Sequence, residues 1–195
     1  MEIFVTGATG FVGRHVAKHL VGQGHRLTCL VRKTSHIQEL EKLGTGIVWG
    51  DVRDPRSLLP GMSGCDALIH LAGVTSFWEP DRKIYADVNV NGTRNVMECA
   101  LKAGTSRVIH MSTLYVYGRP AKIPFNEDSV IGPERFSEYA RTKHEGERVA
   151  WGLFSKKNLP LTVCYPGIVL GPGRDGRHFS PVRRLVEHVL VSRST

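Results

Sequence analysis

The sequence predicts an α/β protein built around a doubly wound parallel sheet. Short apolar runs alternate with segments of helical periodicity along most of the chain, which is typical of strands joined by helical crossovers. A glycine-rich turn directly follows the first apolar run. In addition, 41% of the 195 residues are hydrophobic, which is enough to bury both faces of such a sheet.

Six apolar runs are expected to form the strands, because each is short and flanked by turn signals or polar residues. They cover residues 3–5, 27–31, 47–49, 67–71, 108–111 and 161–165. Right-handed crossovers between them give the doubly wound arrangement, with a ligand crevice at the carboxyl ends of the strands.

Helices are expected between the strands, where apolar residues recur at helical spacing and end signals flank them. The first begins near Phe11 and ends at Gly22, and the third opens with Asp54 as N-cap and Pro55 at its first position. The others are expected over 38–43, over 82–103 before Gly104, over 139–154 after the cap Ser137, and from residue 180 onward. The irregular stretch 118–136 has the length of a functional loop over a site.

Charge and residue usage exclude several classes of function. The chain carries 26 Lys and Arg against 18 Asp and Glu, a formal charge of +8 that suits anionic ligands. No block of basic residues favours nucleic acid, so no such partner is expected. The four cysteines form no C-x-x-C pair and are expected to be buried, reduced thiols. His15 and His19 lie four apart without an acidic or thiol neighbour, so no metal site is expected.

No targeting signal is visible in the sequence. The first residues already belong to a predicted strand, and no apolar stretch is long enough to span a bilayer. We therefore expect a cytoplasmic protein without a membrane partner.

The first functional motif is the glycine-rich turn. Residues 6–13, Thr-Gly-Ala-Thr-Gly-Phe-Val-Gly, fit the pattern T-G-x-x-G-x-x-G between the first predicted strand and the first predicted helix. In that setting Gly7 allows a tight turn, Gly10 lets the backbone approach a pyrophosphate, and Gly13 brings the helix against the strand. The N–H groups at the start of the helix would hold the phosphates. The motif therefore predicts a Rossmann-type site for a nicotinamide dinucleotide.

Residues after the second strand indicate which dinucleotide binds. Arg32, followed by Lys33, stands where an acidic side chain would bind the ribose 2′-hydroxyl of NAD. A cation there instead accommodates the 2′-phosphate of NADP, so NADP is expected and NAD is the less favoured cofactor. Asp51 is expected to contact the adenine or, alternatively, to cap a turn. The cofactor residues predicted up to the fourth strand and its loop are Gly7, Thr9, Gly10, Phe11, Val12, Gly13, Arg32, Lys33, Asp51, Val52, Leu71, Ala72 and Gly73.

The candidate catalytic residues follow later in the chain. Tyr139 and Lys143 lie four apart on a predicted helix, so their side chains share one face. A free phenol has a pKa of about 10, which a neighbouring ammonium and an oxidised nicotinamide would lower. Tyr139 would then exchange a proton with a carbonyl oxygen during hydride transfer. A hydroxyl of Ser112 or Thr113, directly after the fifth strand, is placed to bind the same oxygen.

Taken in order, these motifs resemble the extended branch of the short-chain dehydrogenase/reductase family. Besides 6–13, the resemblance includes 71–73, Asn-Val-Asn-Gly-Thr at 89–93, Ser-Thr-Leu-Tyr-Val-Tyr-Gly at 112–118 and Pro-Gly-Ile-Val-Leu-Gly-Pro-Gly at 166–173. It therefore covers nearly the whole chain. It implies that Thr113 is the catalytic hydroxyl, with Ser112 beside it, and that Tyr139 and Lys143 are the catalytic pair.

The same resemblance adds further expectations about the site and the assembly. Pro166 and Ile168 would line the nicotinamide pocket, Lys143 would also bind the nicotinamide ribose, and Asn89 would join the catalytic set. Members of the family often dimerise through two long helices, here 82–103 and 137–154. A homodimer is therefore expected.

One departure within the family separates the candidate reactions. Sugar-nucleotide dehydratases carry an acidic pair directly after the catalytic hydroxyl, where this chain has Leu114 and Tyr115. Dehydration is therefore not expected, and the sequence predicts an NADP-dependent oxidoreductase that reduces a carbonyl, or oxidises an alcohol, of a small organic substrate. Residues 70–78 resemble dihydroflavonol-reductase-type members, in which Phe77 and Trp78 would line an apolar pocket, unless they only pack within their loop. A sugar-nucleotide epimerase and a non-catalytic NADP-binding regulatory module are the alternatives.

The predicted domain organisation is a dinucleotide-binding domain over 1–173 and a tail over 174–195. The tail is expected to hold a short helix and to start a truncated substrate lobe, because 22 residues are too few for a lobe with its own core. We therefore expect cofactor binding, with substrate turnover weakened or absent.

Overall fold

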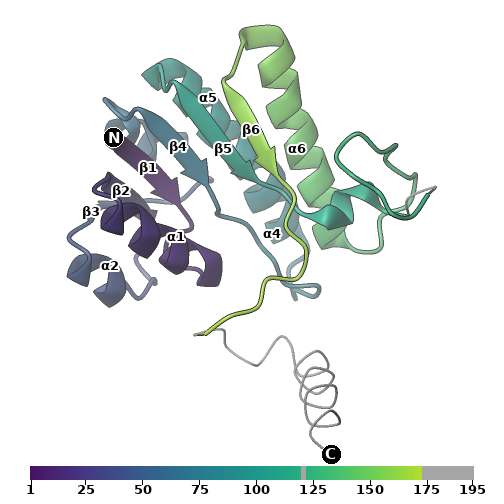
Figure 1. The fold of residues 1–195 in the computed structure, drawn as a ribbon, viewed down its shortest axis with the longest axis horizontal. Coiled ribbons are helices and arrows are strands. Elements are labelled where there is room, and N and C mark those ends of the chain that lie inside the picture. The colour runs from purple at the N-terminus through teal and green to yellow at the C-terminus, as the bar shows by residue number, and fades with distance from the viewer. Residues whose placement is uncertain (120–121, 173–195) are drawn as a thin grey trace, which may run out of the picture.

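The computed structural model describes residues 1–119 and 122–172 and shows a six-stranded sheet with helices on both faces (Figure 1). The strands are β1 (Glu2–Thr6), β2 (Arg26–Val31), β3 (Gly46–Trp49), β4 (Ala67–His70), β5 (Arg107–Met111) and β6 (Leu161–Cys164). Their order is β3-β2-β1-β4-β5-β6, and all neighbouring strands are parallel. The predicted fold class is confirmed.

The order in which successive strands are added to the sheet changes direction at β1. This strand pairs with β2 on one side and with β4 on the other, and Thr6 at its end is in register with Leu30 and His70. In doubly wound sheets, ligands bind where the order reverses, outside the carboxyl ends of the strands. The glycine-rich turn after β1 and the loop after β4 therefore lie at this position.

Several helices begin and end at the predicted signals. Helix α1 (Phe11–Gly22) follows the glycine turn, and α2 (Gln38–Lys42) lies between β2 and β3. Helix α5 (Thr93–Ala103) ends at Gly104, which takes the left-handed conformation with φ 69°. Helix α6 (Glu138–Lys157) begins after Ser137, whose hydroxyl accepts a hydrogen bond from the Ala140 N–H at 3.1 Å. It ends at Lys157, beyond the predicted end at residue 154, and left-handed Asn158 caps it.

Other helices differ from the sequence prediction. The single helix expected over 82–103 is divided into α4 (Lys83–Tyr85), a π-helical segment η2 (Ala86–Gly92) and α5. The helix expected after Asp54 is a 3₁₀ turn, η1 (Pro55–Ser57), followed by α3 (Leu59–Met62), although Asp54 does cap it. A 3₁₀ turn, η3 (Leu114–Tyr117), forms where no helix was predicted. Apolar periodicity does not distinguish one helical hydrogen-bond pattern from another, because all three patterns keep similar spacing over a few residues.

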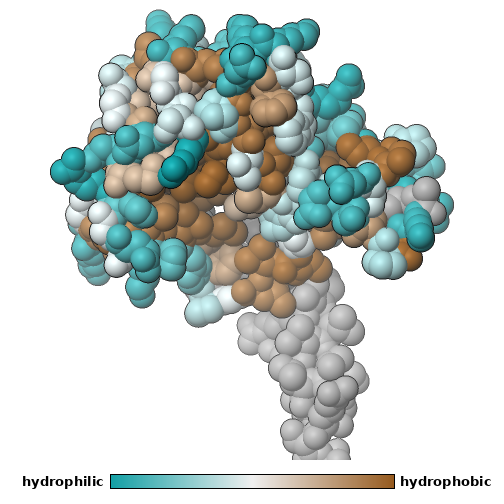
Figure 2. Space-filling view, turned by 45° about the horizontal axis from the view of Figure 1, so that its top comes forward, coloured by the Kyte–Doolittle hydropathy of each residue, from teal (hydrophilic) through white to brown (hydrophobic). Residues whose placement is uncertain are grey.

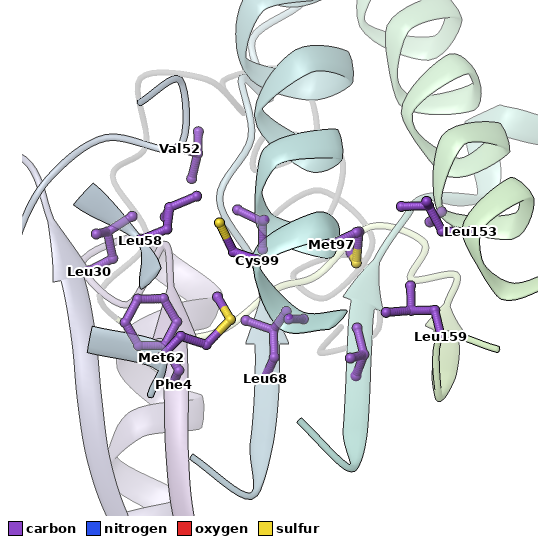
Figure 3. Packing of buried hydrophobic residues seen from close by; sticks show 14 residues of the cluster. Phe4, Leu30, Val52, Leu58, Met62, Leu68, Met97, Cys99, Leu153 and Leu159 are labelled. Carbon is purple, nitrogen blue, oxygen red and sulfur yellow. The ribbon is translucent and has the colours of Figure 1, made fainter. Parts of the chain in front are cut away.

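Two apolar clusters bury the two faces of the sheet. One joins alternate residues of β1, β2 and β4 to α1 and α2, and includes Val5, Cys29 and Ala17. The other joins the intervening strand residues to α3, α5 and α6, as Phe4, Leu68 and Met97 show in Figure 3. Alternation along each strand thus sends successive side chains to opposite clusters, as expected for a sheet that is covered on both faces.

The remaining predictions concern exposure and the end of the chain. All four cysteines are free, with Cys29 and Cys99 buried and Cys65 and Cys164 partly buried. None of the helices in the described part of the chain is both long enough and apolar enough to cross a bilayer. The helix predicted from residue 180 and the tail over 174–195 lie outside the described residues.

Candidate active site

The glycine turn between β1 and α1 has the close backbone contacts that its motif predicts. Gly7 has φ +75°, and a Cβ there would lie 2.6 Å from the backbone nitrogen of Ala72. The Gly10 N–H donates to the carbonyl oxygen of Gly7 at 3.0 Å. A Cβ at Gly13 would lie 2.1 Å from that same oxygen. Any side chain at either position would therefore push the turn apart.

The amino end of α1 points from this turn toward the carboxyl edge of the sheet. Its N-cap is Gly10, no side chain of the described residues caps the helix, and its first turn contains no acidic residue. Among the described residues, neither a capping side chain nor an acidic residue of the first turn offsets the partial positive charge of this helix end. Gly10 is exposed at this end, and Thr9, Phe11 and Val12 beside it are partly buried.

The loop after β4 lies directly against the glycine turn. The Leu71 N–H donates to the Thr6 carbonyl at 3.1 Å, and the Ala72 N–H donates to the Thr6 hydroxyl at 3.3 Å. A Cβ at Gly73 would lie 3.2 Å from Oδ1 of Asn89. Residues 71–73 are thus brought together with the turn, as predicted for a segment beneath the adenosine ribose.

Cations gather at the ends of β2 and β3. Arg32 and Lys33 are exposed directly after β2. Asp51, after β3, forms two hydrogen bonds with the guanidinium of Arg53 at 3.0 and 2.8 Å, and it accepts the Arg53 N–H at 2.9 Å. The hydrogen bonds with Arg53 hold the pKa of Asp51 below its usual value, although partial burial acts to raise that pKa. The positive charge of Arg32 lowers it further. Asp51 therefore has the turn-capping contact that was the alternative to adenine binding, and Val52 is buried beside it.

Arg53 is a functional candidate that the sequence reasoning missed. It lies two residues from the predicted adenine contact, and its side chain is 48% exposed. The signal was present in the sequence as a basic residue after the third strand. We overlooked Arg53 because the sequence alone does not show that its guanidinium pairs with the Asp51 carboxylate in the folded chain.

Thr113, Tyr139 and Lys143 are brought together at the carboxyl end of β5. Thr113 follows β5 and caps η3, while the other two lie on α6. Their exposed fractions are 4%, 9% and 6%, and the Thr113 side chain interacts with the Tyr139 phenol. Burial raises the pKa of Tyr139, Thr113 opposes this rise, and nearby Tyr115 adds to it.

The environment of Lys143 changes the prediction for Tyr139. The Lys143 ammonium donates to the Met111 carbonyl at 2.6 Å, and burial lowers the pKa of Lys143 to about 8, against the opposing effect of Glu147. The protein groups alone therefore raise the pKa of Tyr139, because desolvation of the phenol outweighs its neighbours. The lowering expected from the sequence would have to come from a positively charged nicotinamide ring.

A second missed residue, Glu147, explains where Ser112 points. The Ser112 hydroxyl donates to the buried Glu147 carboxylate, which also accepts from the Tyr165 hydroxyl at 2.7 Å and from Trp151 Nε1 at 3.3 Å. Ser112 is therefore engaged away from Tyr139, and Thr113 is the hydroxyl that faces it. The four-residue spacing from Tyr139 through residue 143 to Glu147 was the signal for a third polar residue on this face of α6.

Asn89 lies on η2, and its side chain joins three segments. Its amide oxygen accepts the Val74 N–H at 2.9 Å, and its amide nitrogen donates to the Val74 carbonyl at 3.2 Å and to Thr142 Oγ1 at 3.1 Å. Asn89 thereby fixes the loop after β4 to α6. Its catalytic role stays a prediction.

Aromatic side chains pack against the Tyr139 ring, and exposed apolar side chains lie on the neighbouring segments. The Phe77 ring lies 5.6 Å from the rings of both Tyr115 and Tyr139. Phe77 is 57% exposed and neighbouring Trp78 is 75% exposed, and after β6 Ile168 is exposed as well. The Pro166 carbonyl accepts the Leu114 N–H at 3.2 Å, which holds this segment beside η3. Figure 2 shows apolar surface gathered on the lower part of the molecule, the side toward which the strands run in Figure 1.

A sequence model described as "NAD dependent epimerase/dehydratase family" matches residues 3–192. The chain belongs to this family. Among its curated relatives, sterol demethylase protein B of Methylococcus capsulatus is 34% identical over 173 residues, which are 88% of this chain and 52% of that protein. A 2-alkyl-3-oxoalkanoate reductase of Stenotrophomonas maltophilia is 30% identical over 182 residues, 89% of this chain and 52% of the relative.

Solved structures of family members have the same fold. The crystal structure of DesIV, a dTDP-glucose 4,6-dehydratase of Streptomyces venezuelae with NAD and TYD bound, superposes with a TM-score of 0.84 at 26% identity. The match covers 96% of this chain and 63% of DesIV. This chain thus spans about half the length of the curated relatives it matches.

Membership of this family confirms the resemblance to extended short-chain dehydrogenases/reductases. The family is described as NAD-dependent epimerases and dehydratases, and the relatives named above include a reductase and a dehydratase whose structure holds NAD. The choice between the two cofactors, the individual site roles and the homodimer through the long helices stay predictions.

Proposed function

We propose that this chain binds NADP and uses Thr113, Tyr139 and Lys143 to reduce a carbonyl group of a small apolar substrate, or to oxidise the corresponding alcohol. The observation that carries the proposal is the joint burial of Thr113, Tyr139 and Lys143 at the carboxyl end of β5, where the Thr113 side chain opposes the rise in the pKa of the Tyr139 phenol. Lys143 lies one helical turn further along the same face.

The described residues fit a dinucleotide. The glycine turn leaves the backbone open to approach at Gly10, and the positive end of α1 suits a pyrophosphate. Arg32 and Lys33 supply positive charge at the end of β2, where a 2′-phosphate would lie. This charge is the support for NADP over NAD.

The chain's own groups would manage the proton and orient the substrate. When bound, the cofactor supplies or accepts the hydride. Tyr139 would donate its phenolic proton to the carbonyl oxygen, and the Thr113 hydroxyl would hold that oxygen in place. Because burial raises the pKa of Tyr139, the phenol stays protonated at neutral pH, which suits reduction more than alcohol oxidation.

The aromatic side chains support an apolar substrate. Phe77 and Tyr115 form an aromatic wall in edge contact with Tyr139, and Trp78 extends exposed apolar surface beside it. A flat or alkyl-bearing carbonyl compound would bury this surface. The substrate of the 2-alkyl-3-oxoalkanoate reductase, to which this chain is similar, is a carbonyl compound with an alkyl chain.

An epimerase is the second candidate, favoured by the description of the matching family. It would use the same three residues to oxidise and re-reduce one carbon of a sugar nucleotide. The two functions differ in the fate of the cofactor. A reductase consumes NADPH and releases the oxidised form, whereas an epimerase regenerates its bound cofactor in each cycle.

The cofactor is tested by titrating the chain with NADPH and NADH while following tryptophan-to-nicotinamide energy transfer. We expect Arg32→Asp to weaken NADPH binding by about tenfold to a hundredfold, as the loss of a charged hydrogen bond implies, and to change NADH binding little. Arg107→Asp is the matched control, because it makes the same charge change at the opposite edge of the sheet. Equal losses for both cofactors with Arg32→Asp would contradict the NADP assignment.

The reaction is tested by NADPH oxidation against a panel of apolar ketones and aldehydes. We expect Tyr139→Phe to lower turnover by about a hundredfold or more while cofactor affinity stays within about threefold. Turnover that survives this substitution would refute the role of Tyr139. Cofactor binding without turnover on the whole panel would favour the regulatory module, and conversion of a sugar nucleotide without net NADPH loss would favour the epimerase.

A further inference from the structure

A buried histidine connects the glycine turn to the helix that follows η2. His70, the last residue of β4, is fully buried. Its Nδ1 lies 2.7 Å from the Thr6 hydroxyl, and its Nε2 lies 3.1 Å from the Thr93 hydroxyl. Thr6 ends β1 and opens the glycine motif, while Thr93 begins α5. One imidazole ring thus spans two segments that are far apart in the sequence.

The hydrogen-bond donors and acceptors determine which nitrogen of His70 carries the proton. The Thr93 hydroxyl donates its single proton to the Asn89 carbonyl at 2.7 Å, so it must accept from His70 Nε2–H. The Thr6 hydroxyl accepts the Ala72 N–H at 3.3 Å and then donates to His70 Nδ1. The five groups therefore form one directed chain, with the imidazole as the neutral Nε2–H tautomer.

Both ends of this chain are backbone atoms in the candidate site. The Ala72 N–H belongs to the loop that lies against Gly7, where a Cβ would approach this nitrogen to 2.6 Å. The Asn89 carbonyl lies against α6, because a Cβ at Gly146 would come within 2.0 Å of its oxygen. Gly146 is three residues after Lys143. The imidazole therefore connects the glycine turn to the helix that carries Tyr139 and Lys143.

A neighbouring histidine provides a natural comparison. The His110 ring stacks on His70 with centroids 5.3 Å apart and an interplanar angle of 23°. It is also buried, yet within residues 1–119 and 122–172 neither of its ring nitrogens has a hydrogen-bond partner. His110 thus contributes ring packing, whereas His70 contributes ring packing and two hydrogen bonds. Burial, together with Lys143, lowers the pKa of His70 to about 3, in agreement with a neutral ring.

We propose that His70 is a positioning residue, which as the neutral Nε2–H tautomer holds the glycine turn, the loop after β4 and the η2–α6 contact in the arrangement that binds the dinucleotide. The effect on cofactor affinity rests on the proposed function. The tautomer does not, and it is measured on the protein without cofactor.

The first experiment is a long-range ¹H–¹⁵N spectrum of the chain labelled with ¹⁵N-histidine, with His70→Asn used to assign the signals. We expect the His70 nitrogens to show one protonated and one bare nitrogen at neutral pH, with the proton on Nε2. A proton on Nδ1, a doubly protonated ring or rapid exchange between tautomers would overturn the proposal.

The second experiment compares the cofactor affinities of variants at the two histidines. We expect His70→Phe, which keeps a ring but loses both hydrogen bonds, to weaken NADPH binding by about tenfold or more. His70→Asn keeps an oxygen near the position of Nδ1 that can accept from Thr6, so it should recover part of this loss. His110→Phe keeps the stacked ring and should stay within about threefold of the natural chain.

The outcomes separate this proposal from the proposed function. If the natural chain binds neither NADPH nor NADH, the proposed function fails, and the spectrum alone decides the tautomer. If it binds and His70→Phe binds equally well, or His110→Phe weakens binding as much, the positioning role is refuted. If His70→Phe does not fold, the Thr6→Val variant takes its place, because it removes the hydroxyl that donates to His70 Nδ1. NADPH affinity in Thr6→Val equal to that of the natural chain would then contradict the positioning role.

Discussion

The contact between α6 and η2 gives a sharp test of the packing around the candidate site. Gly146 and Gly152 both lie in α6, and alanine would raise the helix propensity at either position by up to about 1 kcal/mol. Their surroundings differ. A Cβ at Gly146 would lie 2.0 Å from the Asn89 oxygen and 3.1 Å from its carbonyl carbon, whereas a Cβ at Gly152 meets nothing within 4 Å.

The magnitude follows from the atoms involved. The obstacle at Gly146 is backbone, which no rotamer change can move, so α6 and η2 must separate by more than 1 Å to restore ordinary contact. Overpacking of this kind costs about 1–3 kcal/mol, and loss of the Asn89–Thr142 hydrogen bond adds about 1 kcal/mol. After the propensity gain, Gly146→Ala should lower the free energy of unfolding by about 1–3 kcal/mol. Gly152→Ala should raise it by about 0.5–1 kcal/mol.

The assay is urea unfolding of both variants and the natural chain, followed by far-UV circular dichroism. The two variants should differ by about 3 kcal/mol, or by roughly 6–12 °C in Tm for a chain of this size. Gly22→Ala, at the end of α1 with nothing within 4 Å of its Cβ, serves as a control outside α6. If Gly146→Ala is as stable as Gly152→Ala, the close approach of α6 to η2 is wrong.

Two further predictions concern the cofactor turn and the buried lysine. Gly13→Ala would place its Cβ 2.1 Å from the Gly7 oxygen, so dinucleotide binding in a fluorescence titration should fall by about tenfold or more, while Gly22→Ala in the same helix should bind normally. Lys143 has a folded pKa of about 8 against 10.5 for a free lysine, so the unfolded chain binds more protons between these values. As pH rises from 8 toward 10, the natural chain should therefore gain up to about 1.4 kcal/mol of stability per pH unit relative to Lys143→Met. A stability difference that stays flat over this range in urea unfolding would show that folding does not lower the pKa of Lys143.

Much of the fold could be predicted because its signals are local. Strand runs, the Asp54 and Ser137 caps and the left-handed Gly104 each act within about four residues, and each appears in the structure where it was expected. The division of the segment 82–103 could not be predicted in the same way. Its π-helical part is stabilised by tertiary contacts of Asn89 with Val74 and Thr142, which no window along the helix contains.

Those candidate site residues that belong to short sequence motifs could be predicted. The glycine turn and the Tyr139–Lys143 spacing led to the residues that the structure brings to the carboxyl edge of the sheet. Arg53, His70 and Glu147 were missed, although each is a charged or polar residue at a strand end or on a catalytic helix face. Their roles depend on partners, and composition alone could not assign those partners.

The hydrogen-bond partners of the site residues lie far away in the sequence. The sequence therefore could not show how deeply these residues are buried or how burial shifts their pKa values. The Thr6–His70 contact spans 64 positions, the Ser112–Glu147 contact 35, and the contact of Lys143 with the Met111 carbonyl 32. A buried polar group is strongly destabilising unless such a partner satisfies it. These long-range hydrogen bonds are therefore the condition under which the motif residues can be buried at all. Burial in turn raises the pKa of Tyr139 and lowers that of Lys143, so the folded sheet, rather than the local spacing, sets the protonation states available for the chemistry.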